Sequence, residues 1–284
     1  MKLGDLVRPL ERWAALDSAA DWLGSTAGSV LGSGSVKSVL SGTWLGHPLH
    51  PALTDLPIGF LTAATVADLF GGEGGASAAD ALTAVGLVTV APTAAAGISD
   101  WVDTVGAERR VGFIHALANV GASTLFLAAL LSRRGGNRAA SRLFSVAGLG
   151  VLNASGYLGG HLVFTAGIGV DHTVFDEPPL EWTKVARESD LADDTAQLMW
   201  AQGYGVMLYR HAGTIHAMAD RCSHAAGPLH EGEVGQDLCV TCPWHGSRFR
   251  LSDGSVMRGP ATAGQPVFDA RVRDGNVEVR RRQE

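Results

Sequence analysis

The stretch HPLHPALTDLPIGFLTAATVADLF, residues 47–70, joins two His-Pro pairs to a long apolar run. Further apolar runs follow it, and the complete set is Ala52–Phe70, Ala81–Ile98, Gly112–Leu131 and Leu143–Phe164. A helix of about 19 residues is about 28 Å long, which matches a hydrocarbon core of about 30 Å. Because only short loops join the runs, they predict an all-α bundle of four helices that crosses a membrane.

The composition divides the 284-residue chain into unlike parts. Up to about Thr165 the chain is apolar and rich in Gly and Ala, whereas after Asp171 it resembles a soluble domain and holds all three cysteines. We therefore expect an N-terminal segment over 1–46, a four-span membrane domain over 47–170 and a soluble domain over 171–284. The net charge of −6 offers no basic face, so we expect no nucleic-acid partner.

We expect no removable signal peptide in the N-terminal segment, since charges interrupt its apolar residues. Leu3, Leu6 and Leu10 fall at helical spacing, which predicts an amphipathic helix that lies in the membrane interface or packs on the bundle. The following GSTAGSVLGSGS, residues 24–35, has the composition of a flexible linker.

The soluble part contains CSHAAGPLHEGEVGQDLCVTCPWHGSRF, residues 222–249. It gives a Cys-x-His pair and a Cys-x-x-His pair, Cys222 with His224 and Cys242 with His245. Two thiolates on one iron and two imidazoles on the other suit an asymmetric di-iron cluster, and the imidazoles raise its reduction potential. A zinc site is the alternative, because Cys239, Cys242 and His245, with Cys222 as a fourth ligand, also have zinc-like spacing.

These loops resemble the Rieske [2Fe-2S] family, and the resemblance runs from about Trp182 to Val279. It includes the Cys-x-His and CPWHG loops and a later GPATAGQP, Gly259–Pro266, that is similar to the family's proline loop. The resemblance implies an all-β antiparallel domain with a [2Fe-2S] cluster. It also implies the metal ligands Cys222, His224, Cys242 and His245, and leaves Cys239 as a small buried thiol.

The loops differ from those of high-potential family members, which carry an extra cysteine in each loop. Gly227 and Trp244 stand at those places, and Phe249 stands where a tyrosine hydroxyl faces the cluster, although Ser247 is kept. Fewer hydrogen bonds to the cluster predict a potential near the low end of the range, about −150 mV. No histidine follows His245, so we expect an electron-transfer protein of the ferredoxin type rather than a self-contained oxygenase.

The membrane part holds four histidines, and four crossings place them all on the side that carries the Rieske domain. His47 and His50 precede the first span, His115 enters the third and His161 ends the fourth, while Asp100 follows the second. Ionisable groups in a membrane are costly and indicate function. The pattern HPxHP with a later GGH also resembles an uncharacterised family of bacterial four-span membrane proteins.

Three ligands suit such a group of histidines: haem b, a quinone, or a metal such as iron or zinc. We favour haem b, with His115 as one axial ligand and His161 or His50 as the other, and with Asp100 or Asp103 fixing a ring tautomer. The predicted function is transfer of electrons between the cluster and this cofactor or quinone. The alternative is a Rieske ferredoxin that the bundle merely tethers for a separate oxygenase or reductase.

The remaining expectations concern location and partners. The lipid bilayer is one partner, and unidentified electron donors and acceptors are the others. We expect the bacterial cytoplasmic membrane, with the Rieske domain on the cytoplasmic side because its loops hold no disulfide. The arginines of the 133–142 loop favour a cytoplasmic position for that loop, which would place the Rieske domain on the other side of the membrane. Arg109 and Arg110 favour a cytoplasmic Rieske domain.

Overall fold

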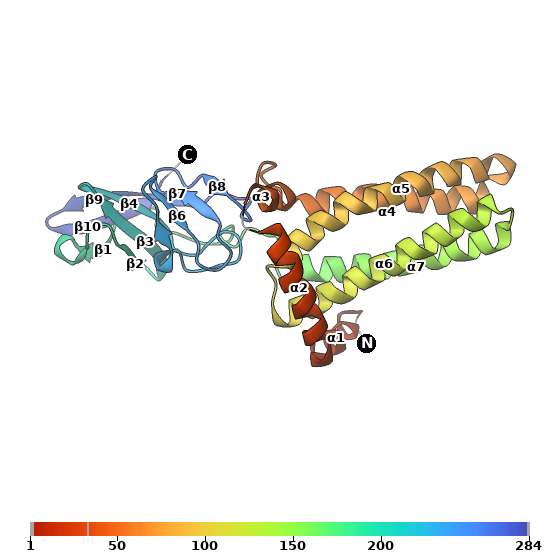
Figure 1. Ribbon diagram of the computed structural model, residues 1–284. Coiled ribbons are helices and arrows are strands. Elements are labelled where there is room, and N and C mark those ends of the chain that lie inside the picture. The colour runs from red at the N-terminus through yellow and green to blue at the C-terminus, as the bar shows by residue number, and fades with distance from the viewer. Residues whose placement is uncertain (1–2, 33, 283–284) are drawn as a thin grey trace. The chain divides into compact units, whose positions relative to one another are not determined.

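The computed structural model describes residues 3–32 and 34–282, which form two compact units (Figure 1). The first unit contains Met1–Leu31 and Leu49–Ile168, and the second contains Gly32–Pro48 and Gly169–Glu284. Each unit is built from two separate stretches of the chain, because residues 32–48 leave the helical part and join the C-terminal part.

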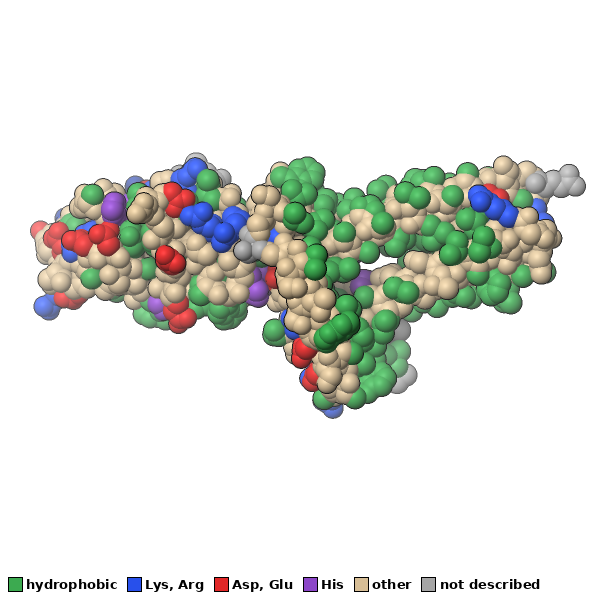
Figure 2. All heavy atoms as spheres, in the orientation of Figure 1, with side chains coloured by type: hydrophobic (Ala, Val, Ile, Leu, Met, Phe, Trp, Pro, Cys, Tyr) green, Lys and Arg blue, Asp and Glu red, His purple; other side chains and the backbone are tan. Residues whose placement is uncertain are grey.

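Four long helices dominate the first unit: α4 (Leu49–Phe70), α5 (Gly72–Trp101), α6 (Gly106–Arg134) and α7 (Arg138–Phe164). Each contains one of the predicted apolar runs and is long and apolar enough to cross a membrane. Large apolar side chains cover their outer surfaces (Figure 2); Val88, Val120 and Leu143, for example, are 73%, 64% and 68% exposed. A surface of this kind suits lipid rather than water, so the predicted membrane bundle is confirmed.

The bundle consists of two helical hairpins, α4 with α5 and α6 with α7. A small apolar cluster joins them, formed by Leu61 of α4, Ala122 and Phe126 of α6, and Leu152 of α7. Far fewer residues connect the hairpins to each other than connect the two helices within each hairpin. The distance between the two hairpins is therefore set by a small number of contacts.

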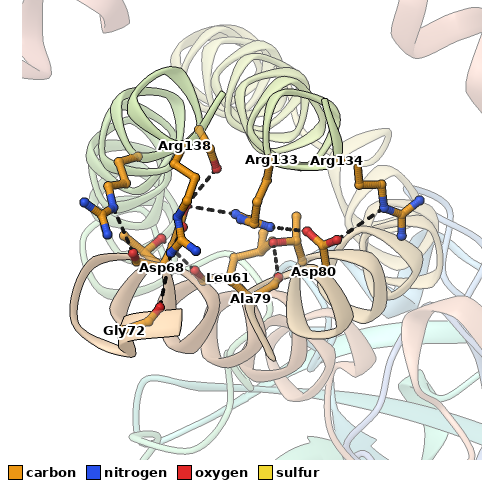
Figure 3. Close-up of polar contacts among 12 residues, drawn as sticks. Leu61, Asp68, Gly72, Ala79, Asp80, Arg133, Arg134 and Arg138 are labelled. Atoms are coloured by element: carbon orange, nitrogen blue, oxygen red, sulfur yellow. Dashed lines mark hydrogen bonds and ion pairs between the residues drawn. The ribbon is translucent and has the colours of Figure 1, made fainter. Parts of the chain in front are cut away.

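Buried ion pairs hold the hairpins together at the end where α4 turns into α5 (Figure 3). The Arg133 guanidinium of α6 lies 3.1 Å from Asp68 Oδ2 of α4 and 2.8 Å from Asp80 Oδ1 of α5. Ser141 of α7 donates its hydroxyl to Asp68 at 2.7 Å, so all four helices contribute. Both the Asp68 and Arg133 side chains are buried, so these ion pairs lie in low-dielectric surroundings. We call the group Asp68, Asp80, Arg133 and Ser141 the clamp.

Short helices of the N-terminal segment pack on the bundle: η1 (Leu3–Leu6), α1 (Arg8–Glu11), η2 (Ala14–Leu16) and α2 (Asp17–Leu31). Packing on the bundle is one of the two predictions for this segment, and the contacts of α1 and α2 with α6 agree with it. The flexible linker predicted for 24–35 is wrong up to Leu31, because these residues complete α2. Gly24 faces the Arg109 guanidinium, which pairs with Asp21 at 2.9 Å, so tertiary contacts override the low helix propensity of glycine.

The second unit combines one short helix, α3 (Ser35–Ser41), with two antiparallel sheets. The larger sheet has the order β1-β10-β9-β4-β3-β2 and the smaller has the order β5-β6-β7-β8. The strands of the larger sheet are β1 (Thr183–Arg187), β2 (Ala196–Ala201), β3 (Tyr204–His211), β4 (Thr214–Ala219), β9 (Val267–Arg273) and β10 (Asn276–Arg281). Those of the smaller are β5 (Glu233–Val234), β6 (Cys239–Thr241), β7 (Arg248–Arg250) and β8 (Val256–Arg258), with the turns η3 (Glu188–Asp190) and η4 (Leu229–Glu231) between strands.

The two sheets pack around a shared apolar core. Alternate residues of β3 divide between its faces: Met207 contributes to the core shared with Val240 and Phe249 of the smaller sheet, whereas Leu208 packs with Phe268 on the other side. This period of two is the pattern that strand geometry requires. The predicted all-β fold of the C-terminal part is confirmed.

Candidate functional site

Two tight loops of similar shape carry the Cys and His pairs of the second unit. The first follows β4, and in it the Cys222 amide donates to the Gly227 carbonyl at 2.9 Å. The second connects β6 to β7, and in it the Cys242 amide donates to the Ser247 carbonyl at 2.8 Å. Each hydrogen bond closes a loop over a few residues and fixes the direction of its cysteine and histidine.

The loops bring like donors together. The Cys222 and Cys242 thiols are hydrogen-bonded to each other, and the His224 and His245 rings lie edge to face with centroids 5.0 Å apart. Each sulfur also accepts backbone N–H groups of its own loop, from residues 224 and 225 for the first and 244 and 245 for the second. A thiol pair beside an imidazole pair is the donor set that an asymmetric [2Fe-2S] cluster needs.

The protonation of these groups also suits metal binding. The hydrogen bond with Cys222 lowers the pKa of Cys242 to about 6, while the same contact and burial raise the pKa of Cys222. Burial, together with a smaller contribution from the nearby His245, lowers the pKa of His224 to about 3. The site therefore favours a thiolate and a neutral imidazole, the forms that bind metals.

A single-ion site does not form here. Among residues 3–32 and 34–282, no three His, Cys, Asp or Glu side chains converge in a way that could hold one metal ion. A Rieske cluster needs only two protein ligands at each iron, and the cysteine pair and the histidine pair supply them. Cys239 is buried on β6 and directs its thiol to the Asp237 carbonyl at 3.6 Å, so it does not complete a zinc site.

The low-potential prediction rests on Gly227, Trp244, Ser247 and Phe249, and the structure shows how these residues lie. A Cβ added to Gly227 would lie 3.0 Å from Trp244 Cγ, so these two positions do face each other across the loops. The Ser247 hydroxyl oxygen accepts the Ala261 amide at 2.9 Å, which ties the proline loop to the second cluster loop. Phe249 is fully buried and adds no hydrogen-bond donor.

The membrane bundle contains a second feature, a cavity of about 340 Å³ between the two hairpins. His50 of α4 and His115 of α6 both line it, and their ring centroids are 6.4 Å apart with the planes nearly perpendicular. The other lining residues are mostly apolar, and Asn119 is the polar exception nearest His115. The two histidines thus come from different hairpins and face one space.

Hydrogen bonds fix the tautomer of both rings. His50 Nδ1 lies 2.9 Å from the Thr93 carbonyl, and His115 Nδ1 lies 2.8 Å from the Ser155 carbonyl. A carbonyl only accepts, so each Nδ1 carries the proton and each Nε2 keeps a lone pair. Asn119 donates to His115 Nε2 at 3.1 Å, and a metal at that atom would replace this bond.

Close-packed glycines make room for these rings. A Cβ on Gly97 of α5 would lie 2.8 Å from His50 Cε1, and one on Gly159 of α7 would lie 3.2 Å from His115 Cε1. Sequence reasoning missed these two glycines and the carbonyls of Thr93 and Ser155. The abundance of Gly in the membrane part was a signal for the glycines, but carbonyl partners leave no trace in a sequence.

The other residues expected at the membrane site do not join the cavity. His161 binds Glu11 through Nε2 at 2.9 Å, so its metal-binding nitrogen is already engaged. His47 belongs to the second unit, where it is exposed and its Nδ1 lies 3.0 Å from the Pro48 carbonyl. Asp100 lies in the last turn of α5 and is not among the residues that line the cavity. Of the five, the structure brings together only His50 and His115.

Known proteins resemble both parts of the chain. A family model described as Rieske [2Fe-2S] domain matches residues 181–269, and one described as predicted membrane protein (DUF2231) matches residues 46–172. Ferredoxin CarAc of Metapseudomonas resinovorans is 31% identical over 99 residues, which are 34% of this chain and 92% of that protein. The anthranilate 1,2-dioxygenase ferredoxin subunit of Burkholderia cepacia is also 31% identical over 99 residues, 35% of this chain and 91% of that protein.

Among solved structures, the ferredoxin of carbazole 1,9a-dioxygenase from Nocardioides aromaticivorans IC177 is 25% identical. The likeness covers 35% of this chain and 96% of that one, with a TM-score of 0.34. The two curated relatives agree with the ferredoxin type predicted from the cluster loops. The chain belongs to the Rieske [2Fe-2S] family, and it joins its Rieske domain to a DUF2231 membrane domain.

Proposed function

We propose that this protein is a membrane-bound electron carrier with two redox sites, one in the Rieske unit and one in the bundle cavity. In the Rieske unit, Cys222 and Cys242 hold one iron of a [2Fe-2S] cluster, and His224 and His245 hold the other. When bound, the cluster supplies one-electron exchange. The protein's own groups supply the low-dielectric surroundings and the backbone N–H donors at each sulfur.

The observation that carries the membrane site is the pair of fixed imidazoles. His50 and His115 each use Nδ1–H on a backbone carbonyl, which directs the basic Nε2 to another partner. A carbonyl behind a ligating histidine is the usual way in which proteins orient and strengthen that ligand. The apolar lining of the cavity favours a cofactor that is itself largely apolar.

Haem b is the first candidate for that cofactor, and His50 and His115 would both ligate its iron. The two ring centroids lie 6.4 Å apart, close enough that one iron between the rings could be held by both imidazoles through bonds of about 2 Å each. When bound, haem would supply a one-electron site in the bundle.

A quinone is the second candidate, and the size of the cavity favours it. A volume of about 340 Å³ lies near the lower end of small-molecule sites and suits a single ring better than a porphyrin. The two Nε2 lone pairs would then accept the hydroxyl protons of the reduced, quinol form. Both candidates place a redox-active group in the bundle, which distinguishes them from simple tethering of a ferredoxin.

The test is a spectrum of the purified full chain in detergent, with the pyridine haemochrome of the extract as a measure of haem. We expect one haem b per chain with a six-coordinate reduced-minus-oxidised spectrum. The His50→Ala and His115→Ala variants should each lose the six-coordinate signal. His161→Ala is the matched control and should keep it, because His161 binds Glu11 outside the cavity.

Haem-free protein from cells that fully load a control cytochrome would reject haem. Extraction of a stoichiometric quinone from the same sample, absent from His115→Ala, would then identify the second candidate. If the sample contains neither haem nor quinone, the bundle serves only as a tether for the Rieske unit. In that event the protein would serve a separate oxygenase or reductase, the kind of partner that its dioxygenase-ferredoxin relatives suggest.

We also propose that the membrane is the bacterial cytoplasmic membrane and that the Rieske unit faces the cytoplasm. Its three cysteines form no disulfide, which suits a reducing compartment. The basic residues at the two ends of the bundle give no clear preference, because arginines occur at both ends.

A further inference from the structure

The two cluster loops have to be held in a fixed position relative to each other. Cys222 and His224 lie on the first loop, and Cys242 and His245 lie on the second. Because the cysteine pair holds one iron of the proposed cluster and the histidine pair holds the other, each iron takes one ligand from each loop. A ligand that is oriented before the metal arrives binds it more firmly, since no free energy is lost in ordering the loop. The groups that orient each loop therefore affect how well the cluster is held.

Gln265, in the proline loop Gly259–Pro266, is a buried side chain at the base of the first cluster loop. It is only 3% exposed. Its Nε2 group donates to the Ala219 carbonyl at 2.9 Å and to the Arg221 carbonyl at 2.6 Å. Its Oε1 atom accepts the Ser223 amide at 3.0 Å. The amide of one side chain thus binds three backbone groups around the start of the first loop.

Two of these bonds fix the backbone of Cys222 itself. The Arg221 carbonyl belongs to the peptide group before Cys222, and the Ser223 amide belongs to the peptide group after it. A peptide group is planar, so the two planes that flank a residue determine its φ and ψ angles. These angles set the direction in which the Cys222 side chain leaves the backbone. Gln265 therefore holds this thiol in one direction.

The proline loop that carries Gln265 is also bonded to both cluster loops by other groups. The Ser223 hydroxyl of the first loop donates to the Ala263 carbonyl at 2.9 Å. The Ala261 amide donates to the hydroxyl of Ser247, the residue whose carbonyl closes the second loop, at 2.9 Å. A series of hydrogen bonds thus connects the first loop to the second through the proline loop.

The backbone groups that Gln265 binds have no easy substitute for it. A buried carbonyl or amide without a partner has lost its hydrogen bonds to water and gained none in return. Ser223 is 2% exposed, so water does not readily replace Gln265 there. We propose that Gln265 is a positioning residue, which holds Cys222 in its metal-binding direction and thereby determines how firmly the protein retains the cluster. The proposal rests on the [2Fe-2S] cluster of the proposed function and does not depend on the membrane cofactor.

The test is the release of iron from the full chain in detergent, followed as loss of the visible absorbance of the cluster in excess iron chelator. The Gln265→Met variant keeps the length of the side chain and removes its three hydrogen bonds. We expect it to release iron roughly tenfold faster than the parent protein, because several hydrogen bonds of modest net strength are lost together. The EPR signal of the reduced cluster should also broaden, since Cys222 would adopt a range of directions.

Gln197→Met is the matched control. The Gln197 side chain also bonds backbone groups, since it accepts the Ala192 amide at 2.7 Å and donates to the Asp190 carbonyl at 3.2 Å. It lies on β2, outside the cluster loops, so this variant should release iron at the parent rate. Hydrogen exchange separates positioning from a general loss of stability. In Gln265→Met, exchange should increase over residues 219–228 and remain at the parent level in β1 and β10.

A second variant, Gln265→Glu, keeps the size of the side chain. Its carboxylate accepts the Ser223 amide but cannot donate to the carbonyls of Ala219 and Arg221. It should therefore also release iron faster than the parent protein.

Release of iron at the parent rate from either Gln265 variant would overturn the proposal, and so would an EPR signal of parent width in Gln265→Met. Equal acceleration in Gln197→Met would overturn it as well. Increased hydrogen exchange throughout the Rieske unit, or failure of both Gln265 variants to fold, would have the same effect, because Gln265 would then have a general structural role. Absence of a cluster from the parent protein is a separate result, which would reject the proposed function instead.

Discussion

Removal of the Asp68 carboxylate should lower the free energy of unfolding of the bundle. Asp68 is fully buried and binds Arg133 at 3.1 Å and Ser141 at 2.7 Å. The Asp68→Ala variant leaves the buried Arg133 with one carboxylate partner, Asp80 at 2.8 Å, instead of two. Breaking a buried ion pair costs about 3–5 kcal/mol. Because Asp80 remains, we expect the lower end of this range, about 3 kcal/mol or roughly a hundredfold in the unfolding equilibrium.

The assay is unfolding of the full chain by SDS titration in mixed micelles, followed by helical circular dichroism. Asp55→Ala is the matched control, since Asp55 also lies on α4 but is exposed and belongs to no ion pair of the clamp. It should cost little, within about 0.5 kcal/mol. The double variant Asp68→Ala with Arg133→Met removes both charges and should recover part of the lost stability.

A loss below about 0.5 kcal/mol for Asp68→Ala would refute the reasoning, because it would mean that Asp80 alone satisfies Arg133. Equal losses for Asp68→Ala and for the double variant would refute it in another way. The cost would then arise from packing and not from an uncompensated charge.

Other predictions follow from the two candidate sites. Cys239→Ser should retain two irons per chain in an iron assay, and iron loss would mean that Cys239 is a ligand. The parent cluster should titrate near the low end of the Rieske range, about −150 mV, and a midpoint well above zero would contradict the interpretation of Gly227, Trp244 and Phe249. Gly159→Val should displace His115 and reduce haem or quinone content at least severalfold in extracted cofactor, whereas unchanged content would exclude this cavity as the site. Ala139→Cys, in the exposed first turn of α7, should react with an impermeant maleimide in intact cells if the Rieske unit is cytoplasmic, and protection would reverse the assigned side.

The sequence by itself determined the features that depend on local pattern. Long apolar runs require helices that satisfy their own backbone hydrogen bonds in lipid, so the four spans could be predicted from composition and length. The Cys and His of each pair lie only two or three residues apart within one loop, so their chemistry was visible in the motif. The prediction of a low reduction potential likewise rests on individual residues such as Gly227 and Phe249.

Only the tertiary structure decided which of the membrane histidines meet. Four histidines lay near the same face by topology, but the rotation of each helix about its axis determines where a side chain points, and this depends on packing against other helices. His50 and His115 thus face one cavity, whereas His161 binds Glu11, a residue 150 positions away in the chain. The same reason applies to α3: its position beside the proline loop comes from contacts more than 200 residues apart, for which a single sequence holds no local signal.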